Sequence, residues 1–334
     1  MNSSVKLDTQ YLGLALGSPL IASAGPLTGK LDNIRRLEEL GAGAVVLPSV
    51  FEEQIEREQQ LVEQLMSAGA DSCGEALSYF PQPSAYALDS ERYLDLIERA
   101  VRAVDLPVIA SLNGVSNRGW IEYARRIESA GAAAIELNIY FVACDVGLSG
   151  AEVEQRYIDT LSAVKRAVSI PVAVKLGPYF SAFAQMAQRL DAAGANGLVL
   201  FNRFYEPDID LAQLSVTPDL SLSRSEDIRL PLLWTAVLHG RLRASLAATS
   251  GVHSVEDVVK YLLAGADVVM TTAALLKYGV GHMRVLVDGL RDWLQSRGLD
   301  SPGAIRGRMS QQHTPEPAAF ERANYIRVLQ SYRG

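Results

Sequence analysis

SIPVAVKLGPYFS, at residues 169–181, joins a short apolar run to a lysine and a Gly-Pro break. An apolar run of this length, opened by a proline, is typical of a parallel strand that is buried on both faces. Lys175 then lies at the carboxyl end of the strand, where an unpartnered ammonium group would be costly to desolvate. Its partner could be a ligand, either an anion or an electron-rich cofactor ring. The alternative is structural: a neighbouring carboxylate, or solvent at the end of the strand.

The same pattern recurs along the chain and predicts an α/β fold. Seven further segments have the composition of buried strands: PLIASAGP, AGAVVLPS, PVIASLNG, AAIELNI, GLVLFN, ASLAATSG and DVVMTTA. Helix-sized stretches lie between most of them, at residues 32–40, 90–104, 119–130, 151–168 and 181–193. Several helices end in a glycine followed by alanine, which suits a left-handed helix stop and a closely packed next strand. Eight such units predict a TIM (β/α)8 barrel, and a doubly wound open sheet is the alternative.

We expect one domain over residues 1–334, with a barrel at about 17–296. A β-hairpin at residues 5–16, formed by VKLDT and LGLAL, precedes the barrel, and a tail at 297–334 follows an amphipathic helix at 282–296. Two long connections, at residues 51–86 and 203–230, follow strands at their carboxyl ends. In a barrel, that is the face on which active sites are built.

Composition excludes several classes of protein. Hydrophobic residues make up 49% and charged residues 21% of the 334 residues, which excludes a disordered chain. A net charge of -7 argues against general nucleic-acid binding. With Cys73 and Cys144 as the two cysteines, the sequence carries neither a disulfide framework nor a cysteine metal cluster. We found no signal-peptide pattern or stretch of membrane-spanning length and expect a cytoplasmic protein.

The candidate site residues are those that end the predicted strands. They are rich in amides and hydroxyls and lack histidine clusters, which argues against metal-dependent hydrolysis. The last two strand ends, Thr249-Ser250-Gly251 and Thr271-Thr272, are followed by helical patterns, the first with Ser254 as its predicted cap. Backbone N–H groups at such turns bind phosphate in barrels, although ordinary capping by serine and threonine is the alternative.

The order of these segments resembles the dihydroorotate dehydrogenase family over about residues 5–295. The resemblance is carried by YLGLALGSPLIASAGP, ELNI, PVAVKLGPYF, LVLFN and SGVHSVEDVVKYLLAGADVVMTTAALLKYG. Members of that family are TIM barrels that hold FMN and oxidise dihydropyrimidine rings or reduce the corresponding products. The resemblance therefore implies FMN as the cofactor.

The resemblance also implies roles for individual residues. Ala22, Ser23, Ala24 and Gly25 would border the flavin ring, and Ser49 and Ser111 would belong to the cofactor site. Asn138 would lie near ring and substrate, Lys175 near the electron-accepting N1–C2 side, and Asn202 near the substrate. Ser250, Gly251, Thr271 and Thr272 would hold the phosphate. Lys175 would act as a fixed cation that stabilises the anionic reduced flavin.

The substrate machinery departs from the family pattern. After Asn138 the family has a Cys or Ser base followed by Pro-Asn, whereas this chain has IYFVAC at residues 139–144. Phe141 cannot accept a proton, so Tyr140 and Cys144 are the candidate proton-transfer residues. The alternative makes Tyr140 a packing residue and Cys144 an ordinary loop cysteine. Pro48 replaces a family lysine, and SYFPQPSAY at 78–86 replaces an asparagine-containing substrate segment.

Three functional hypotheses follow. The first is an FMN-dependent oxidoreductase acting on CH–CH groups, which transfers hydride between FMN and a small substrate; a dihydropyrimidine-like compound is one candidate, and a compound other than dihydroorotate is favoured. The second is a non-catalytic flavin- or ligand-binding barrel that works as a scaffold or sensor. The third is a flavin-free barrel in which Lys175 forms a Schiff base. The acidic stretch 51–64 is a candidate docking site for a redox partner protein, and the alternative is that it is an ordinary solvated helix face. A homodimer is also compatible with the sequence.

Overall fold

The computed structural model describes residues 5–51, 90–113, 119–203, 207–217, 221–321 and 329–330. Within these ranges eight parallel strands form a closed barrel in the order β3-β4-β5-β6-β7-β8-β11-β12, and β12 pairs with β3. The predicted TIM barrel is therefore confirmed, and the open sheet is excluded. The strands are β3 (Leu20–Ala22), β4 (Ala44–Phe51), β5 (Val108–Asn113), β6 (Ala134–Asn138), β7 (Val172–Leu176), β8 (Gly197–Leu200), β11 (Ser245–Ala248) and β12 (Val268–Thr271).

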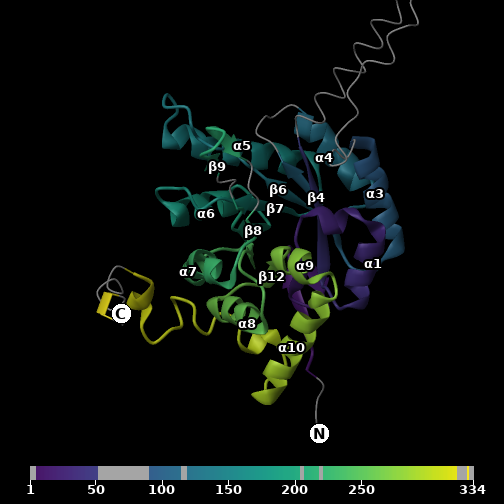
Figure 1. The fold of residues 1–334 in the computed structure, drawn as a ribbon, viewed down its shortest axis with the longest axis vertical. Coiled ribbons are helices and arrows are strands. Elements are labelled where there is room, and N and C mark those ends of the chain that lie inside the picture. Colours follow the sequence, from purple (N-terminus) through teal and green to yellow (C-terminus); the bar gives the residue numbers. More distant parts are fainter. Residues whose placement is uncertain are drawn as a thin grey trace, which may run out of the picture.

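Helices surround the barrel (Figure 1). They are α1 (Leu31–Glu39), α3 (Ser90–Ala103), α4 (Gly119–Ser129), α5 (Gly150–Ala167), α6 (Phe183–Ala192), α7 (Arg229–Leu238), α8 (Val255–Ala264), α9 (Ala273–Tyr278) and α10 (His282–Ser296). Short 3-10 helices are η1 (Pro26–Gly29), η2 (Ser225–Ile228), η3 (Pro302–Ala304) and η4 (Pro317–Phe320). The predicted helices agree with these bounds closely, because their apolar spacing and glycine stops are local signals.

Successive strand residues point alternately into the barrel and out toward the helices, and this gives two cores. The inner cluster includes Ile21, Val46, Ile109, Ala134, Ala173, Val199, Ala247 and Met270. The outer cluster joins the other face of the same strands to the helices, with residues such as Leu112, Leu137 and Val174. Both faces are covered, and this explains why the strands are continuous apolar runs in the sequence.

A two-stranded hairpin, β1 (Thr9–Tyr11) and β2 (Leu14–Leu16), precedes the barrel as predicted, although its first strand begins later than VKLDT. Tyr11, Leu12 and Leu16 belong to the inner cluster and cover the barrel near its amino end. The Leu12 N–H donates to Ser245 Oγ at 3.1 Å. A Cβ added at Gly197 would lie 2.4 Å from Leu12 Cδ2, so a glycine is needed where the hairpin meets β8.

The two long connections differ in what the structure describes. Cys73, the segment 78–86 and nearly all of the acidic stretch 51–64 lie outside the described residues. The second connection carries the antiparallel pair β9 (Asp208–Asp210) and β10 (Ser215–Thr217), followed by η2. Among the helices described, none combines the length and the apolar character that a membrane crossing requires.

Candidate functional site

A cavity of about 790 Å³ opens at the carboxyl ends of the barrel strands, a size suited to a small-molecule ligand. Ten predicted site residues line it: Ser23, Ala24, Gly25, Tyr140, Lys175, Asn202, Ser250, Gly251, Thr271 and Thr272. The lining also includes Asn113 and Thr249, which end predicted strands, and Phe51, Phe201, Arg203, Asp208 and Ser223, to which the sequence assigned no role. The predicted residues Ala22, Ser49, Ser111, Asn138 and Cys144 do not line the cavity.

Two rows of mostly polar side chains cross four neighbouring strands, one at this mouth and one below it. The upper row pairs Phe51, Asn113, Asn138 and Lys175 in register across β4, β5, β6 and β7. The lower row pairs Ser49, Ser111, Glu136 and Ala173 in the same way. Because residues two apart on a strand share a face, both rows point into the barrel. The register of the sheet thus places the predicted amides and the lysine side by side.

Lys175 has a carboxylate partner and also lines the cavity. Its Nζ lies 3.4 Å from Glu136 Oε1, and the two side chains are 10% and 1% exposed. Both kinds of partner considered from the sequence therefore remain compatible with its position. Sequence reasoning missed Glu136, although a signal existed: an acid stands inside the apolar run AAIELNI, two residues before Asn138.

Three predicted residues that do not line the cavity are connected to one that does. Asn202 Nδ2 donates to Asn138 Oδ1 at 2.5 Å, and Asn138 Nδ2 donates to Ser49 Oγ at 3.4 Å. The hydroxyls of Ser49 and Ser111 lie 2.8 Å apart. An irregularity in the register of β4 between Val46 and Ser49 returns Ser49 to the barrel interior. This chain of hydrogen bonds fixes the orientation of the Asn202 amide at the mouth.

The end of β3 is joined to the end of β12. Thr272 Oγ1 lies 3.0 Å from the Ser23 carbonyl oxygen, to which it donates. A Cβ added at Gly25 would lie 2.7 Å from Thr272 Cγ2. Ala22 is the exception in this segment, because it belongs to the outer cluster and faces the helices. The segment from Ser23 to Gly25 forms a wall of small side chains along the cavity.

The turn after β11 is held in an unusual backbone conformation. Ser250 and Gly251 have φ values of 78° and 72°, and serine rarely adopts such a value. The Tyr261 hydroxyl on α8 contacts the carbonyl oxygens of Thr249 at 3.2 Å and Ser250 at 2.7 Å. A Cβ added at Gly251 would lie 2.7 Å from Ile228 N, so glycine is needed where η2 approaches.

Not every predicted donor at this turn is available to a ligand. The Gly251 N–H donates to Ser223 Oγ at 3.3 Å, and the Thr271 hydroxyl donates to the Val252 carbonyl oxygen at 2.9 Å. Ser254 caps α8 as predicted, in a capping box with Asp257. The residues after β11 therefore both cap helix α8 and form part of the cavity wall.

The loop after β6 separates the two candidate proton-transfer residues. Tyr140 lines the cavity, whereas Cys144 is an exposed free cysteine. Phe141, between them in the sequence, lies beneath the Arg156 guanidinium on α5, with 4.9 Å between the guanidinium carbon and the ring centroid. Between the two candidates, the structure therefore brings Tyr140 to the mouth.

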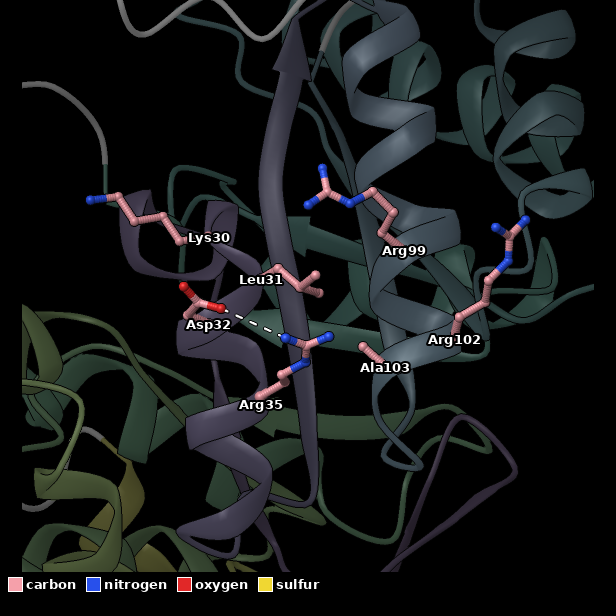
Figure 2. Close-up of a pocket in the computed structure, with 7 residues that line it drawn as sticks. All are labelled: Lys30, Leu31, Asp32, Arg35, Arg99, Arg102 and Ala103. Carbon is pink, nitrogen blue, oxygen red and sulfur yellow. Dashed lines mark ion pairs between the residues drawn. The ribbon is translucent and has the colours of Figure 1, made fainter.

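A second cavity, of about 620 Å³, lies between α1 and α3 on the outside of the barrel (Figure 2). Its charged lining residues are Lys30, Asp32, Arg35, Arg99 and Arg102, and it shares no residue with the cavity at the mouth. Each arginine pairs with a carboxylate of its own helix, as Arg35 does with Asp32 at 3.8 Å. Exposed pairs of this kind contribute little energy and do not indicate a site.

A metal ion bound by the described residues would need a cluster of ligating side chains. No group of three histidine, cysteine, aspartate or glutamate side chains is placed among those residues to hold a metal ion.

Comparison with known proteins identifies relatives along most of the chain. The profile of the family described as dihydroorotate dehydrogenase matches residues 6–294. A protein of Aeropyrum pernix named for dihydroorotate dehydrogenase A (fumarate) is 30% identical over 314 residues, covering 92% of this chain and 98% of the relative. The dihydroorotate dehydrogenase B (NAD(+)) catalytic subunit of Methanocaldococcus jannaschii is 25% identical, covering 88% and 95%. The NAD-dependent dihydropyrimidine dehydrogenase subunit PreA of Escherichia coli is 28% identical, covering 59% and 51%.

Proposed function

Because the chain belongs to the dihydroorotate dehydrogenase family of flavin oxidoreductases, we propose that it binds FMN in the cavity at the mouth of the barrel. We further propose that it transfers hydride between this cofactor and a small substrate of the dihydropyrimidine type. The observation that carries the proposal is the position of Lys175, a buried cation on the cavity wall in register with Asn138 and Asn113. That is the place where an electron-accepting ring needs a fixed positive charge.

The residues present fit FMN on two further grounds. Gly25 and Gly251 line the cavity, and because a Cβ on either would meet a neighbouring protein atom at 2.7 Å, these parts of the wall carry no side chain. The cavity combines this small-residue wall with amides and hydroxyls on opposite strands, as cofactor sites do.

Each part of the site would have its own task. Bound FMN supplies hydride acceptance and donation, which no side chain can perform. Ser23, Ala24 and Gly25 would border the ring, and Lys175 would hold a positive charge beside it. Ser250 and Thr272 would face the phosphate end. Asn202, oriented by Asn138, would present its amide to the substrate.

The proton-transfer group is a separate part of the proposal. A base must reach the carbon from which it removes a proton, and Tyr140 lines the cavity whereas Cys144 is exposed away from that lining. We therefore assign the role of proton-transfer residue to Tyr140. Tyr140→Phe should slow flavin reduction by the substrate strongly, and Cys144→Ser should leave it unchanged.

The test begins with the purified chain. It should be yellow, or become yellow on incubation with FMN, and dithionite should bleach the flavin band. Anaerobic mixing with dihydroorotate and with a neutral dihydropyrimidine then shows which donor bleaches the same band. A protein that stays colourless after incubation with FMN would refute the proposal. Stable FMN binding without reduction by either donor would instead favour the non-catalytic barrel.

We also propose a protein partner as the electron acceptor. Support comes from the relatives of Methanocaldococcus jannaschii and Escherichia coli, whose names describe them as subunits. Affinity purification of the tagged chain from its own cells should recover a stoichiometric second polypeptide. Recovery of the chain by itself at native expression level would count against this part.

A further inference from the structure

We propose that Glu136 is a positioning residue for Lys175 that also moderates the charge presented to the cofactor. It holds the ammonium group at the cavity wall, and its negative charge offsets part of the positive potential there. This inference rests on the proposed binding of FMN, but it concerns a residue that does not line the cavity.

The geometry places Glu136 directly beneath the site. It lies in β6, in register with Ser111 on one side and Ala173 on the other, and two residues before Asn138. Its neighbours in that row are short side chains, which leave the barrel axis to the carboxylate. Among the described residues, Lys175 is the cation with which Glu136 forms an ion pair. The pair spans adjacent strands and fixes the position of the ammonium group between the two rows.

The Glu136 carboxylate is buried at a cost in desolvation free energy. Its Oε2 atom is buried without a hydrogen-bond partner in the described part of the chain, and so is the hydroxyl of Tyr11 below it in the inner cluster. Burial raises the pKa of Tyr11, and the negative charge of Glu136 raises it further. An apolar pair would fill the same space without this desolvation penalty, so stability alone does not account for the charged pair.

The position of the Glu136–Lys175 pair indicates an electrostatic role at the cavity. Lys175 lies on the cavity wall and Glu136 lies one layer deeper, so the cation is the nearer charge to any ligand. Coulomb energy falls with distance, and the net potential at the wall stays positive but smaller than that of the lysine by itself. Removing the carboxylate should therefore favour reduced, anionic flavin over oxidised flavin.

The experiment measures the midpoint potential of bound FMN in the holoprotein. Glu136→Gln should raise it by about 30 mV or more, which for a two-electron couple is a tenfold change in the ratio of affinities for reduced and oxidised flavin. Glu136→Met removes the same charge without adding an amide, and it should give the same direction if the amide of glutamine disturbs the barrel. Asp267→Asn is the matched control, because Asp267 pairs with Arg306 at the amino end of β12 and should leave the potential unchanged.

Lys175→Met completes a double-mutant cycle. In that background Glu136→Gln should raise the potential by more than it does in the wild type, because the negative charge is lost in both backgrounds and a lysine is released only in the wild type. A potential that is unchanged or lower in both Glu136 variants would overturn the inference, and equal shifts in the two backgrounds would overturn the positioning role. A wild-type chain that binds no FMN would refute the proposed function itself, which separates the two failures.

Discussion

At the scale of single residues, the site depends on close approaches between strand ends. Gly25 has an extended backbone with φ of 174°, a conformation open to any residue. What requires glycine there is the Thr272 methyl group, which would lie 2.7 Å from an added Cβ. Thr272 cannot move freely, because its hydroxyl is bonded to the Ser23 carbonyl oxygen. The constraint is thus steric and lies on the cavity wall.

Gly25→Ala should weaken the binding of both FMN and riboflavin by about tenfold or more, since displacing Thr272 moves the wall by a few tenths of an ångström. Flavin fluorescence titration measures both affinities. Gly17→Ala is the control, because an added Cβ there meets nothing within 4 Å. Equal affinities in Gly25→Ala and wild type would show that flavin does not use this wall.

At the scale of elements, tyrosines on three helices anchor the strand ends that form the site. The Tyr93 hydroxyl on α3 accepts from the Ser111 N–H at 2.8 Å, and the Tyr157 hydroxyl on α5 donates to the Ile139 carbonyl oxygen at 3.2 Å. Tyr261 on α8 holds the turn at Ser250 in the same way. Burial raises the pKa of all three, to about 12 for Tyr157, so their hydroxyls stay protonated at physiological pH.

Tyr261→Phe should cost about 1 kcal/mol of unfolding free energy and weaken FMN several-fold while leaving riboflavin unaffected. The reason is that the lost hydrogen bond supports the turn assigned to the phosphate, which riboflavin lacks. Tyr157→Phe removes a hydroxyl of the same kind at the end of β6 and should cost similar stability with no selective loss of FMN. Equal losses of FMN and riboflavin in Tyr261→Phe would contradict the phosphate assignment.

At the scale of the whole molecule, the amino end of the barrel is packed with core side chains and the carboxyl end holds the cavity. Tyr11, Leu12 and Leu16 of the hairpin fill the region near the amino end, and the cavity opens at the carboxyl end. The inner cluster lies between them. Stability and ligand binding should therefore respond separately to changes at the two ends, as they do in barrels generally.

Leu12→Ala should lower the unfolding free energy by about 2–5 kcal/mol, because Leu12 is a buried core side chain. Its FMN affinity should match that of the wild type. Urea unfolding and flavin titration test the two statements. Leu211→Ala, at an 83% exposed position, is the control and should change stability by less than about 0.5 kcal/mol. A large loss of FMN affinity in Leu12→Ala at temperatures where it is folded would show that the ends are coupled.

The sequence by itself determined the alternation of strands and helices, the hairpin before the barrel and the strand ends that carry Lys175 and Asn202. These follow from apolar periodicity and glycine stops, which act within a few residues. Only the tertiary structure decided that the sheet closes, that Glu136 meets Lys175 across 39 residues of sequence, and that Asn138 meets Asn202 across 64. It also placed Tyr140 at the mouth and Cys144 outside it. Such contacts depend on the register between strands that are distant in sequence, and no local pattern encodes that register.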